Sequence, residues 1–400
     1  MPRATNNNKR VFYATQAVAI GDMGATTVKD SWQASTGGTD FIGTGNLMIA
    51  HGLQSIGVTT NFNLEQIFEL GQLSLYENYE EVPDIEVTFE KVLDGYTLMY
   101  HAGTPSAVSP TLTGRANART DVRMAVGVDT NEYMASGVNS GVAELYCSGM
   151  YISSVSYTLG TDGNFTESTT FVGNNKDWIT TTGTGGVLTS DANGALVAAL
   201  STGVFGSNAP GSPNNSVLRR NNLVIGSGFV ALGSGTFRTE VPNLLDGGAA
   251  GTLTNSKYIG STSGPYIQSI SISCDLGREN IQQLGKKGPY YRYVSFPVDV
   301  TCDIEVTATG GDNVDALEEG DPSTGKNLSN HSIQLVLSDS TVFQLGKKNK
   351  LTSVSYGGGD AGGGNATITY SFTNSNDFVV LHSGDPMVMA TSAYWKDWFA

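Results

Sequence analysis

An internal duplication constrains this sequence more than any other feature. Residues 53–83 align without a gap to residues 267–297, at an offset of 214, with ten identities in thirty-one positions. A second anchor, residues 153–157, matches residues 352–356 at an offset of 199. Because a sequence repeat is normally one structural unit, two anchors in the same order predict two related domains in one chain.

Each copy is predicted to consist mainly of strands. Apolar residues alternate at Leu53, Ile56 and Val58 in the first copy and at matching positions in the second, which is typical of a half-buried strand. A long strand is predicted later in each copy, at 85–89 and 298–306, and each copy closes with a hairpin. The sequence therefore predicts antiparallel β structure throughout both copies.

A short helix is predicted after the first strand of each copy, at 64–70 and 278–284. Gly71 and Gly285 follow these segments, and glycine is the usual left-handed residue that ends a helix. We therefore expect a positive φ at both glycines and place both among the residues that shape the assembly surface.

The fold class that these patterns predict is mainly β, with two related antiparallel β-barrel or sandwich domains, each flanked by a short helix. The predicted division is an N-terminal arm at 1–45, a first β-domain at 46–180, an insertion rich in Gly, Ser and Asn at 181–262, a second β-domain at 263–385 and an aromatic C-terminal tail at 386–400.

The hairpin tip at 357–365 is almost all glycine. A turn with so little side chain buries almost nothing but can reach a neighbouring molecule. We expect it to contribute to assembly rather than to stability, through Gly358, Asp360 and Gly363.

Charge is distributed unequally between the copies. The chain has 22 Lys and Arg against 37 Asp and Glu, a net charge of −15, which argues against a surface that grips nucleic acid. Residues 61–95 carry nine acids and one base, whereas residues 275–309 carry five acids and four bases. One interpretation is a solvated acidic face. The other is that the acidic first copy meets the more basic second copy of a neighbouring chain, through Glu77, Glu80, Glu81, Lys286, Lys287, Arg292, Lys347 and Lys348.

No motif for catalysis, cofactor binding or metal binding stands out. The four histidines are scattered, and the Gly-rich stretches lack the lysine of a phosphate-binding loop. A glycosidase needs only two carboxylates, so motifs do not exclude that chemistry. Asp312 and Asp360 lie in Gly-rich turns but lack the spacing of a calcium loop. We expect a protein that is not an enzyme and has no cofactor.

The three cysteines, Cys147, Cys274 and Cys302, are too few for a disulfide framework. Free thiols fit a reducing compartment. The polar N-terminus is unlike a signal peptide, and no run of eighteen apolar residues predicts a membrane anchor. We expect a protein made and assembled in a cytoplasm.

Two runs resemble the tail tube proteins of tailed bacteriophages. They are residues 52–71, continued by 82–96, and the second-copy run 345–356 with its Gly-rich hairpin and residues 376–378. The resemblance covers both copies but not the insertion. It implies a structural virion protein whose β-domains form rings, commonly sixfold, that stack into a tube. The lumen of such a tube carries DNA and the tape-measure protein without specific binding, and sheath and baseplate proteins are further partners. It supplies no catalytic residues.

A chain with two copies departs from the usual single-copy pattern of that family. If the copies lie side by side, three chains close a pseudo-sixfold ring, and acidic and basic segments alternate around it. If the copies stack along the axis, six chains are needed, and acidic copies become neighbours, which is unfavourable. We therefore favour the trimer over the hexamer.

Two alternatives to a tail tube subunit stay open. The first is a baseplate hub or another virion structural subunit, which would not stack into long tubes by itself. The second is a β-rich carbohydrate-binding or glycan-cleaving protein, which would be a monomer with an aromatic groove.

Overall fold

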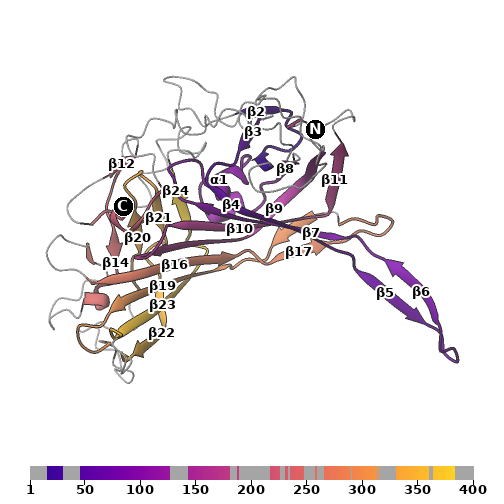
Figure 1. The fold of residues 1–400 in the computed structure, drawn as a ribbon. Helices are drawn as coiled ribbons and strands as arrows, with labels where there is room; N and C mark the ends of the chain where they lie inside the picture. The colour runs from indigo at the N-terminus through magenta and orange to yellow at the C-terminus, as the bar shows by residue number, and fades with distance from the viewer. Residues whose placement is uncertain are drawn as a thin grey trace, which may run out of the picture.

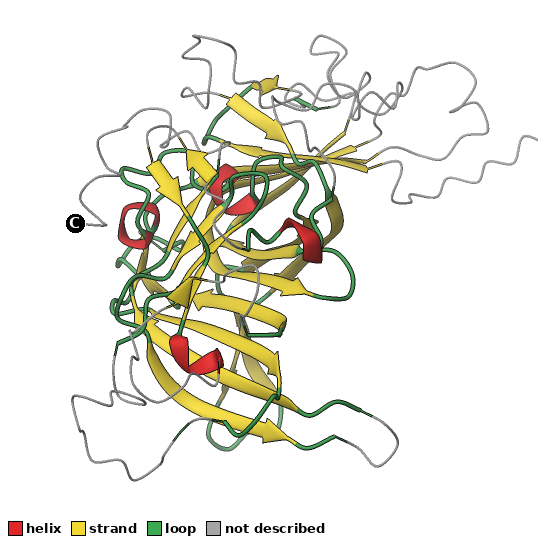
Figure 2. Cartoon of the chain, turned by 90° about the vertical axis from the view of Figure 1, so that its left-hand side faces the viewer, coloured by secondary structure: helices red, strands yellow, loops and turns green. Residues whose placement is uncertain are grey.

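The computed structural model describes the chain over 16–29, 46–126, 143–180, 187–188, 217–225, 230–232, 235–246, 257–258, 265–289, 291–312, 314, 330–359 and 364–382. Within these residues the protein is mainly β, and strands of both copies join in one large sheet network (Figure 1). Figure 2 shows that helices contribute only short turns. The sheets are sandwich-like, and in the part of the chain described here none closes into a barrel.

A continuous antiparallel sheet, called the long sheet here, runs through both copies. The first copy contributes, in spatial order, β4 (Leu53–Asn61), β7 (Asp84–Val92), β10 (Thr166–Gly173) and β9 (Ala143–Gly160). The second copy contributes β16 (Ile267–Asp275), β19 (Asp299–Thr307), β23 (Thr367–Ser375) and β22 (Lys350–Gly357). β9 pairs with β16, so the two copies lie side by side in one sheet.

The pairing inside the two copies repeats, which confirms the duplication at the level of single residues. β4 and β16 each carry an irregularity after the first residue, at the same place of the repeat. The Ser55 hydroxyl donates to the Glu90 carboxylate at 3.4 Å, and the counterpart Ser269 donates to Glu305 at 3.0 Å. The predicted opening strands, long strands and closing hairpins are therefore all present in both copies.

A second layer of strands covers one face of the long sheet. In the first copy β2, β3, β1, β8 and β11 join the N-terminal half of β9. Their bounds are β1 (Gln16–Gly21), β2 (Thr27–Lys29), β3 (Asn46–Ile49), β8 (Thr120–Val126) and β11 (Asn175–Thr180). Gly149 has a φ of 63° where β9 passes from this layer into the long sheet, a backbone conformation that glycine adopts without strain.

In the second copy a five-stranded sheet takes the place of that layer. Its strands are β15 (Lys257–Tyr258), β14 (Glu240–Val241), β20 (Gln334–Val336), β21 (Val342–Gln344) and β24 (Val379–Leu381). A separate small hairpin is formed by β12 (Val230–Leu232) and β13 (Gly235–Phe237). One apolar core cluster includes side chains from both copies and both layers, for example Val87, Val122, Ile304 and Phe343.

Among the described residues the two α-helices are short, and both lie in the first copy. They are α1 (Met99–Ala102) and α2 (Leu112–Arg115), and the 3-10 turns are η3 (Arg220–Asn222) and η4 (Asn243–Asp246). Glu167 accepts hydrogen bonds from the backbone N–H of Met99 at 2.7 Å and of Tyr100 at 2.9 Å. Burial raises the pKa of Glu167, and these bonds, which stabilise the carboxylate, oppose that shift.

The helices predicted at 64–70 and 278–284 are wrong, because both segments are strands of hairpins. β5 (Leu64–Phe68) pairs with β6 (Leu75–Glu80), and β17 (Arg278–Ile281) pairs with β18 (Tyr291–Val294). A seven-residue helix is marginal by itself, whereas pairing with the following aromatic strand supplies cross-strand contacts.

The positive φ predicted for the two glycines is confirmed, at 93° for Gly71 and 84° for Gly285. They serve hairpin turns rather than helix ends.

Parts of the predicted N-terminal segment (1–45) and of the predicted insertion (181–262) are strands of the sheets. Within the expected 1–45 arm, β1 and β2 are strands of the second layer. Within the expected 181–262 insertion, β14 pairs with β20 of the second copy, and the N–H groups of Val187 and Leu188 both donate to the buried Glu144 at 2.8 Å. The tail predicted at 386–400 lies outside the described residues.

Candidate assembly surfaces

The strand pairing between β9 and β16, called the internal joint here, shows how the two copies contact each other. The Leu276 N–H donates to the Ser153 carbonyl at 2.7 Å at one end, and the Thr161 N–H donates to the Gln268 carbonyl at 2.9 Å at the other. Seven residue pairs lie in register between them. Because the pairing runs through these seven pairs without an irregularity, the joint is a continuous strand–strand interface.

The β17–β18 hairpin of the second copy docks on the first copy beside this joint. Arg292 Nη2 lies 2.5 Å from Asp84 Oδ1, and Arg292 also donates to Asn174 Oδ1. Arg278 Nε donates to the Ile152 carbonyl at 2.8 Å. The Tyr291 ring contacts Tyr151 edge-on, with ring centroids 6.0 Å apart. The hairpin is therefore fixed by ion-pair, hydrogen-bond and aromatic contacts.

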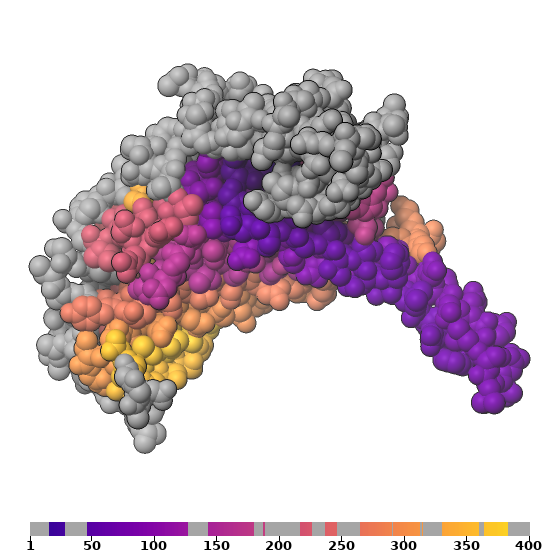
Figure 3. Space-filling view, viewed as in Figure 1, coloured from indigo at the N-terminus to yellow at the C-terminus, as the bar shows by residue number. Residues whose placement is uncertain are grey.

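The corresponding β5–β6 hairpin of the first copy, called the arm here, projects away from the body (Figures 1 and 3). Every residue of β5 and β6 is exposed. Apolar side chains are prominent on it: Leu64, Ile67, Phe68, Leu70, Leu73, Leu75, Tyr76 and Tyr79. A hairpin with two apolar faces in water is at most marginally stable, and an exposed patch of this kind marks a protein contact surface.

Among the described strands, the long sheet has one unpaired edge in each copy. In the part of the chain that the structure describes, β4 pairs only with β7, and β22 pairs only with β23. Side chains on these edge strands are more exposed than their counterparts at the internal joint. Tyr356 on β22 is 54% exposed, whereas its counterpart Tyr157 on β9 is 0% exposed. Phe62, directly after β4, is 68% exposed, whereas its counterpart Leu276, directly after β16, is 3% exposed.

One face of the long sheet is polar and acidic. Its outward positions alternate with buried core positions along each strand, and most of them are Ser or Thr. Ser273 and Thr301, for example, hydrogen bond at 2.6 Å. The outward charged residues are Glu86, Glu90, Asp275, Asp299, Asp303 and Glu305, together with Asp84, which is paired with Arg292, and Lys350 at the β22 edge. This face therefore presents negative charge and hydroxyl groups.

The structure brings only some of the predicted assembly residues together. Glu77 and Glu80 are exposed on the arm, and Lys347 and Lys348 are exposed before β22. Gly358 is exposed after β22, whereas Asp360 and Gly363 lie outside the described residues. Lys286 and Lys287 line a cavity of about 240 Å³ with Glu81 and Asp84, so acidic and basic segments meet there within one chain.

Arg292 is buried in its own chain, where it contacts the first copy rather than a neighbour. Sequence reasoning missed its partners Asp84 and Asn174, and it missed the edge strands. Comparing Phe62 with Leu276 across the repeat would have given a signal for the contact surface at the β4 edge, because an apolar side chain recurs at that position in both copies.

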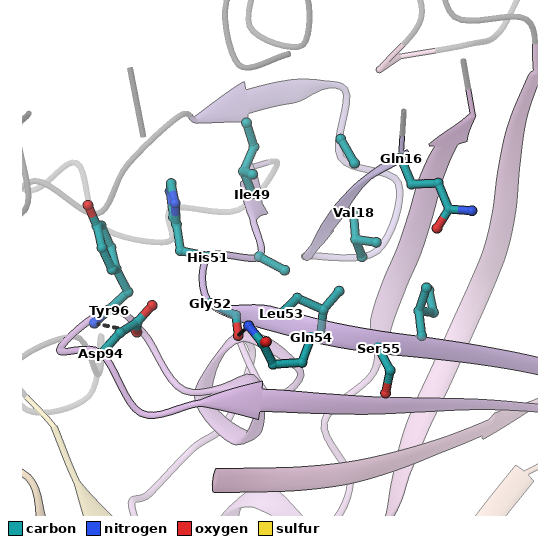
Figure 4. Close-up of a pocket in the computed structure, with 13 residues that line it drawn as sticks. Gln16, Val18, Ile49, His51, Gly52, Leu53, Gln54, Ser55, Asp94 and Tyr96 are labelled. Carbon is teal, nitrogen blue, oxygen red and sulfur yellow. Dashed lines mark hydrogen bonds between the residues drawn. The ribbon is translucent and has the colours of Figure 1, made fainter. Parts of the chain in front are cut away.

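A larger cavity, of about 810 Å³, lies beside the β4 edge (Figure 4). Asp94 is the carboxylate in its lining, and it bonds Lys91 Nζ at 2.6 Å. The His51 ring stacks on Tyr96 with centroids 4.3 Å apart. Leu53 and Ile56 form part of its wall. The counterpart of Ile56 in the second copy, Ile270, is 1% exposed because β9 lies beside it. The cavity therefore lies along β4, at the edge where the described residues include no neighbouring strand.

The structure shows no metal centre within the residues it describes. No cluster of three or more His, Cys, Asp or Glu side chains there has the geometry to hold a metal ion. The three cysteines are free and buried. Burial raises the pKa of the Cys147 and Cys274 thiols to about 12 and that of Cys302 well above its usual range, so their reactive thiolate forms are scarce at neutral pH.

Within the same described ranges, no helix has both the length and the apolar character that a membrane span requires. No protein-family model matches the chain, and no curated protein is significantly similar to it.

Proposed function

We propose that this chain is a tail tube subunit of a tailed bacteriophage, and that it forms rings that stack into a tube in the virion. The observation that carries the proposal is the long sheet. It joins two copies of one four-stranded unit edge to edge and presents a Ser, Thr and carboxylate face. Within the described ranges it also has an unpaired edge at each end.

The unpaired edges support ring formation. β4 is the counterpart of β16, and β22 is the counterpart of β9, so the two ends of the sheet are complementary in the same way as the strands of the internal joint. A head-to-tail contact of this kind closes into a ring when its rotation allows. With two copies per chain, three chains build a ring of six units, which matches the sixfold rings of the resembled family.

The acidic face supports a lumen that conducts DNA. Phosphates are repelled by carboxylates, and the outward positions of the long sheet carry seven carboxylates, of which Asp84 is paired with Arg292, and one lysine. A wall of this kind lets DNA and the tape-measure protein pass without binding. In this proposal the protein assembles in the host cytoplasm, and sheath and baseplate proteins contact the outside and the end of the tube.

Electron cryo-microscopy and native mass measurement of the purified full chain test the proposal. We expect rings of three chains that stack into tubes with the long sheet on the lumen. Six chains per ring would contradict the trimer, single rings that never stack would favour a baseplate hub, and a monomer at all concentrations would overturn the proposal.

A further inference from the structure

The internal joint is a template for a joint between two chains, because each strand of it has a counterpart at an unpaired edge. β16 corresponds to β4 at an offset of 214, and β9 corresponds to β22 at an offset of 199. Within the internal joint Ser156 lies opposite Ser273. The same pairing between chains places Ser355 of one chain opposite Thr59 of a second copy.

We propose that β22 of one chain pairs with β4 of a second copy of this chain in the register of the internal joint, and that the arm of that second copy then docks on the first chain with Glu77 beside Lys350. The inference rests on the proposed self-assembly and identifies the surfaces and residue pairs that perform it.

The burial pattern favours a second copy as the occupant of these edges. On β22 the inward side chains Leu351 and Val354 are half-buried, whereas their counterparts Ile152 and Val155 are each 1% exposed. β4 shows the same difference: Val58 is half-buried, and its counterpart Ile272 is fully buried. In the described part of the chain, each edge strand therefore differs from its counterpart at the internal joint in having no strand beside it.

The arm repeats the hairpin that docks at the internal joint. In β5–β6, Ile67 lies opposite Glu77, and in β17–β18, Ile281 lies opposite Tyr291. The two hairpins thus share one register at an offset of 214. Because the β17–β18 hairpin contacts the copy next to it, the arm has an equivalent surface on the second copy of a neighbouring chain.

Charge fits this docking. At the internal joint the contacting pair is Tyr291 and Tyr151. The counterparts of these residues are Glu77 and Lys350, both exposed. An aromatic contact within the chain is thus replaced by opposite charges between chains, which favours the head-to-tail contact over pairing of like copies.

Cysteine cross-linking tests the register. Hydrogen bonds at Leu276 and Thr161 flank the internal joint, and because hydrogen-bonded and non-hydrogen-bonded pairs alternate, Ser156 and Ser273 form a non-hydrogen-bonded pair. Their Cα atoms are close enough for a disulfide. We expect Thr59→Cys with Ser355→Cys to give covalent multimers of the full chain under mild oxidation.

Three controls accompany that variant. Ser156→Cys with Ser273→Cys should cross-link within the chain and leave its mass on a denaturing gel monomeric. In Thr59→Cys with Ser353→Cys, both cysteines are on the same face of the sheet but are two residues out of register. This variant should cross-link at least about tenfold more slowly, because diagonal neighbours are about 7–8 Å apart. The native sequence should not cross-link, since its cysteines are buried.

Charge reversal tests the arm. Glu77→Lys and Lys350→Glu should each raise the concentration needed for assembly roughly tenfold, and the double variant should restore assembly. Asp303→Lys makes the same charge change on β19, two strands from the edge, and should assemble normally.

The outcomes separate this inference from the proposed function. Rings that form while Thr59→Cys with Ser355→Cys stays unlinked, although the internal control cross-links, would overturn the proposed joint and leave the tube standing. A double charge reversal that fails to restore assembly would overturn the arm contact. A chain that remains monomeric would overturn both the joint and the proposed function.

Discussion

Arg292 on the second copy and Asp84 on the first form an ion pair, with Nη2 2.5 Å from Oδ1, at the place where the two copies lie side by side. Arg292 is 6% exposed and also donates to Asn174. The repeat is therefore held together by side chains as well as by strand pairing, and the two copies behave as one structural unit.

Replacing Arg292 should weaken the chain itself rather than its assembly. Arg292→Met leaves Asn174 Oδ1 without this donor and Asp84 without its ion-pair partner at a partly buried site, so the free energy of unfolding should fall by about 1–3 kcal/mol. Urea denaturation of the purified chain measures this. Lys287→Met, at the exposed hairpin tip, is the matched control and should change stability by less than about 0.5 kcal/mol. Equal stability of both variants would show that the hairpin is not docked.

The two hairpin glycines should respond differently to the same substitution. Both have positive φ with open space around the missing Cβ, so valine introduces backbone strain of about 1 kcal/mol or more. Gly285→Val strains the docked hairpin and should lower the free energy of unfolding by that amount. Gly71→Val strains the undocked arm and should leave unfolding of the monomer nearly unchanged while impairing assembly. Thermal melting and light scattering separate the two effects, and identical melting losses would contradict the difference.

The buried thiols predict a loss of stability at alkaline pH. Burial raises the pKa of the Cys147 and Cys274 thiols from 9.0 to about 12. Between about pH 9 and 12 the unfolded chain therefore loses thiol protons that the folded chain keeps, and stability falls as pH rises. Below pH 9 the thiols contribute no pH dependence. Denaturation midpoints at several pH values measure the slope.

A cysteine variant isolates the thiols from other groups that titrate at high pH. Cys274→Ala should flatten the decline between pH 9 and 12 relative to the native sequence. A thiol reagent at pH 8 should label the denatured chain but not the folded one. Rapid labelling of the folded protein would contradict the burial of its cysteines.

The acidic face should decide whether an assembled tube binds DNA. Glu86→Lys with Asp303→Lys places one lysine on that face in each copy. Both positions are exposed, so stability should change by less than about 0.5 kcal/mol per site. Assembled variant tubes should retain DNA in low salt and release it as salt rises, whereas native tubes should not retain it. Asp162→Lys, in the exposed turn after β9, is the control and should behave like the native sequence.

Local patterns in the sequence were sufficient to predict the opening strand and the long strand of each copy. Alternation of apolar residues from Leu53 to Val58 predicted β4, and the 214-residue offset transferred the prediction to β16. The same local view was misleading at 64–70. There a glycine after seven residues suits a helix end and a hairpin turn equally, because both need a positive φ. The strand that pairs with this segment decided between them.

The sequence by itself determined that the chain is a duplicated, β-rich, acidic protein, because periodicity, repeats and composition are properties of the chain alone. Only the tertiary structure decided that β9 and β16 join the copies into one sheet, that Arg292 contacts Asp84, and that β4 and β22 remain as edges. These features depend on contacts between residues more than 100 positions apart. Such contacts form when buried faces and backbone hydrogen bonds are satisfied together in three dimensions, so no local pattern records them.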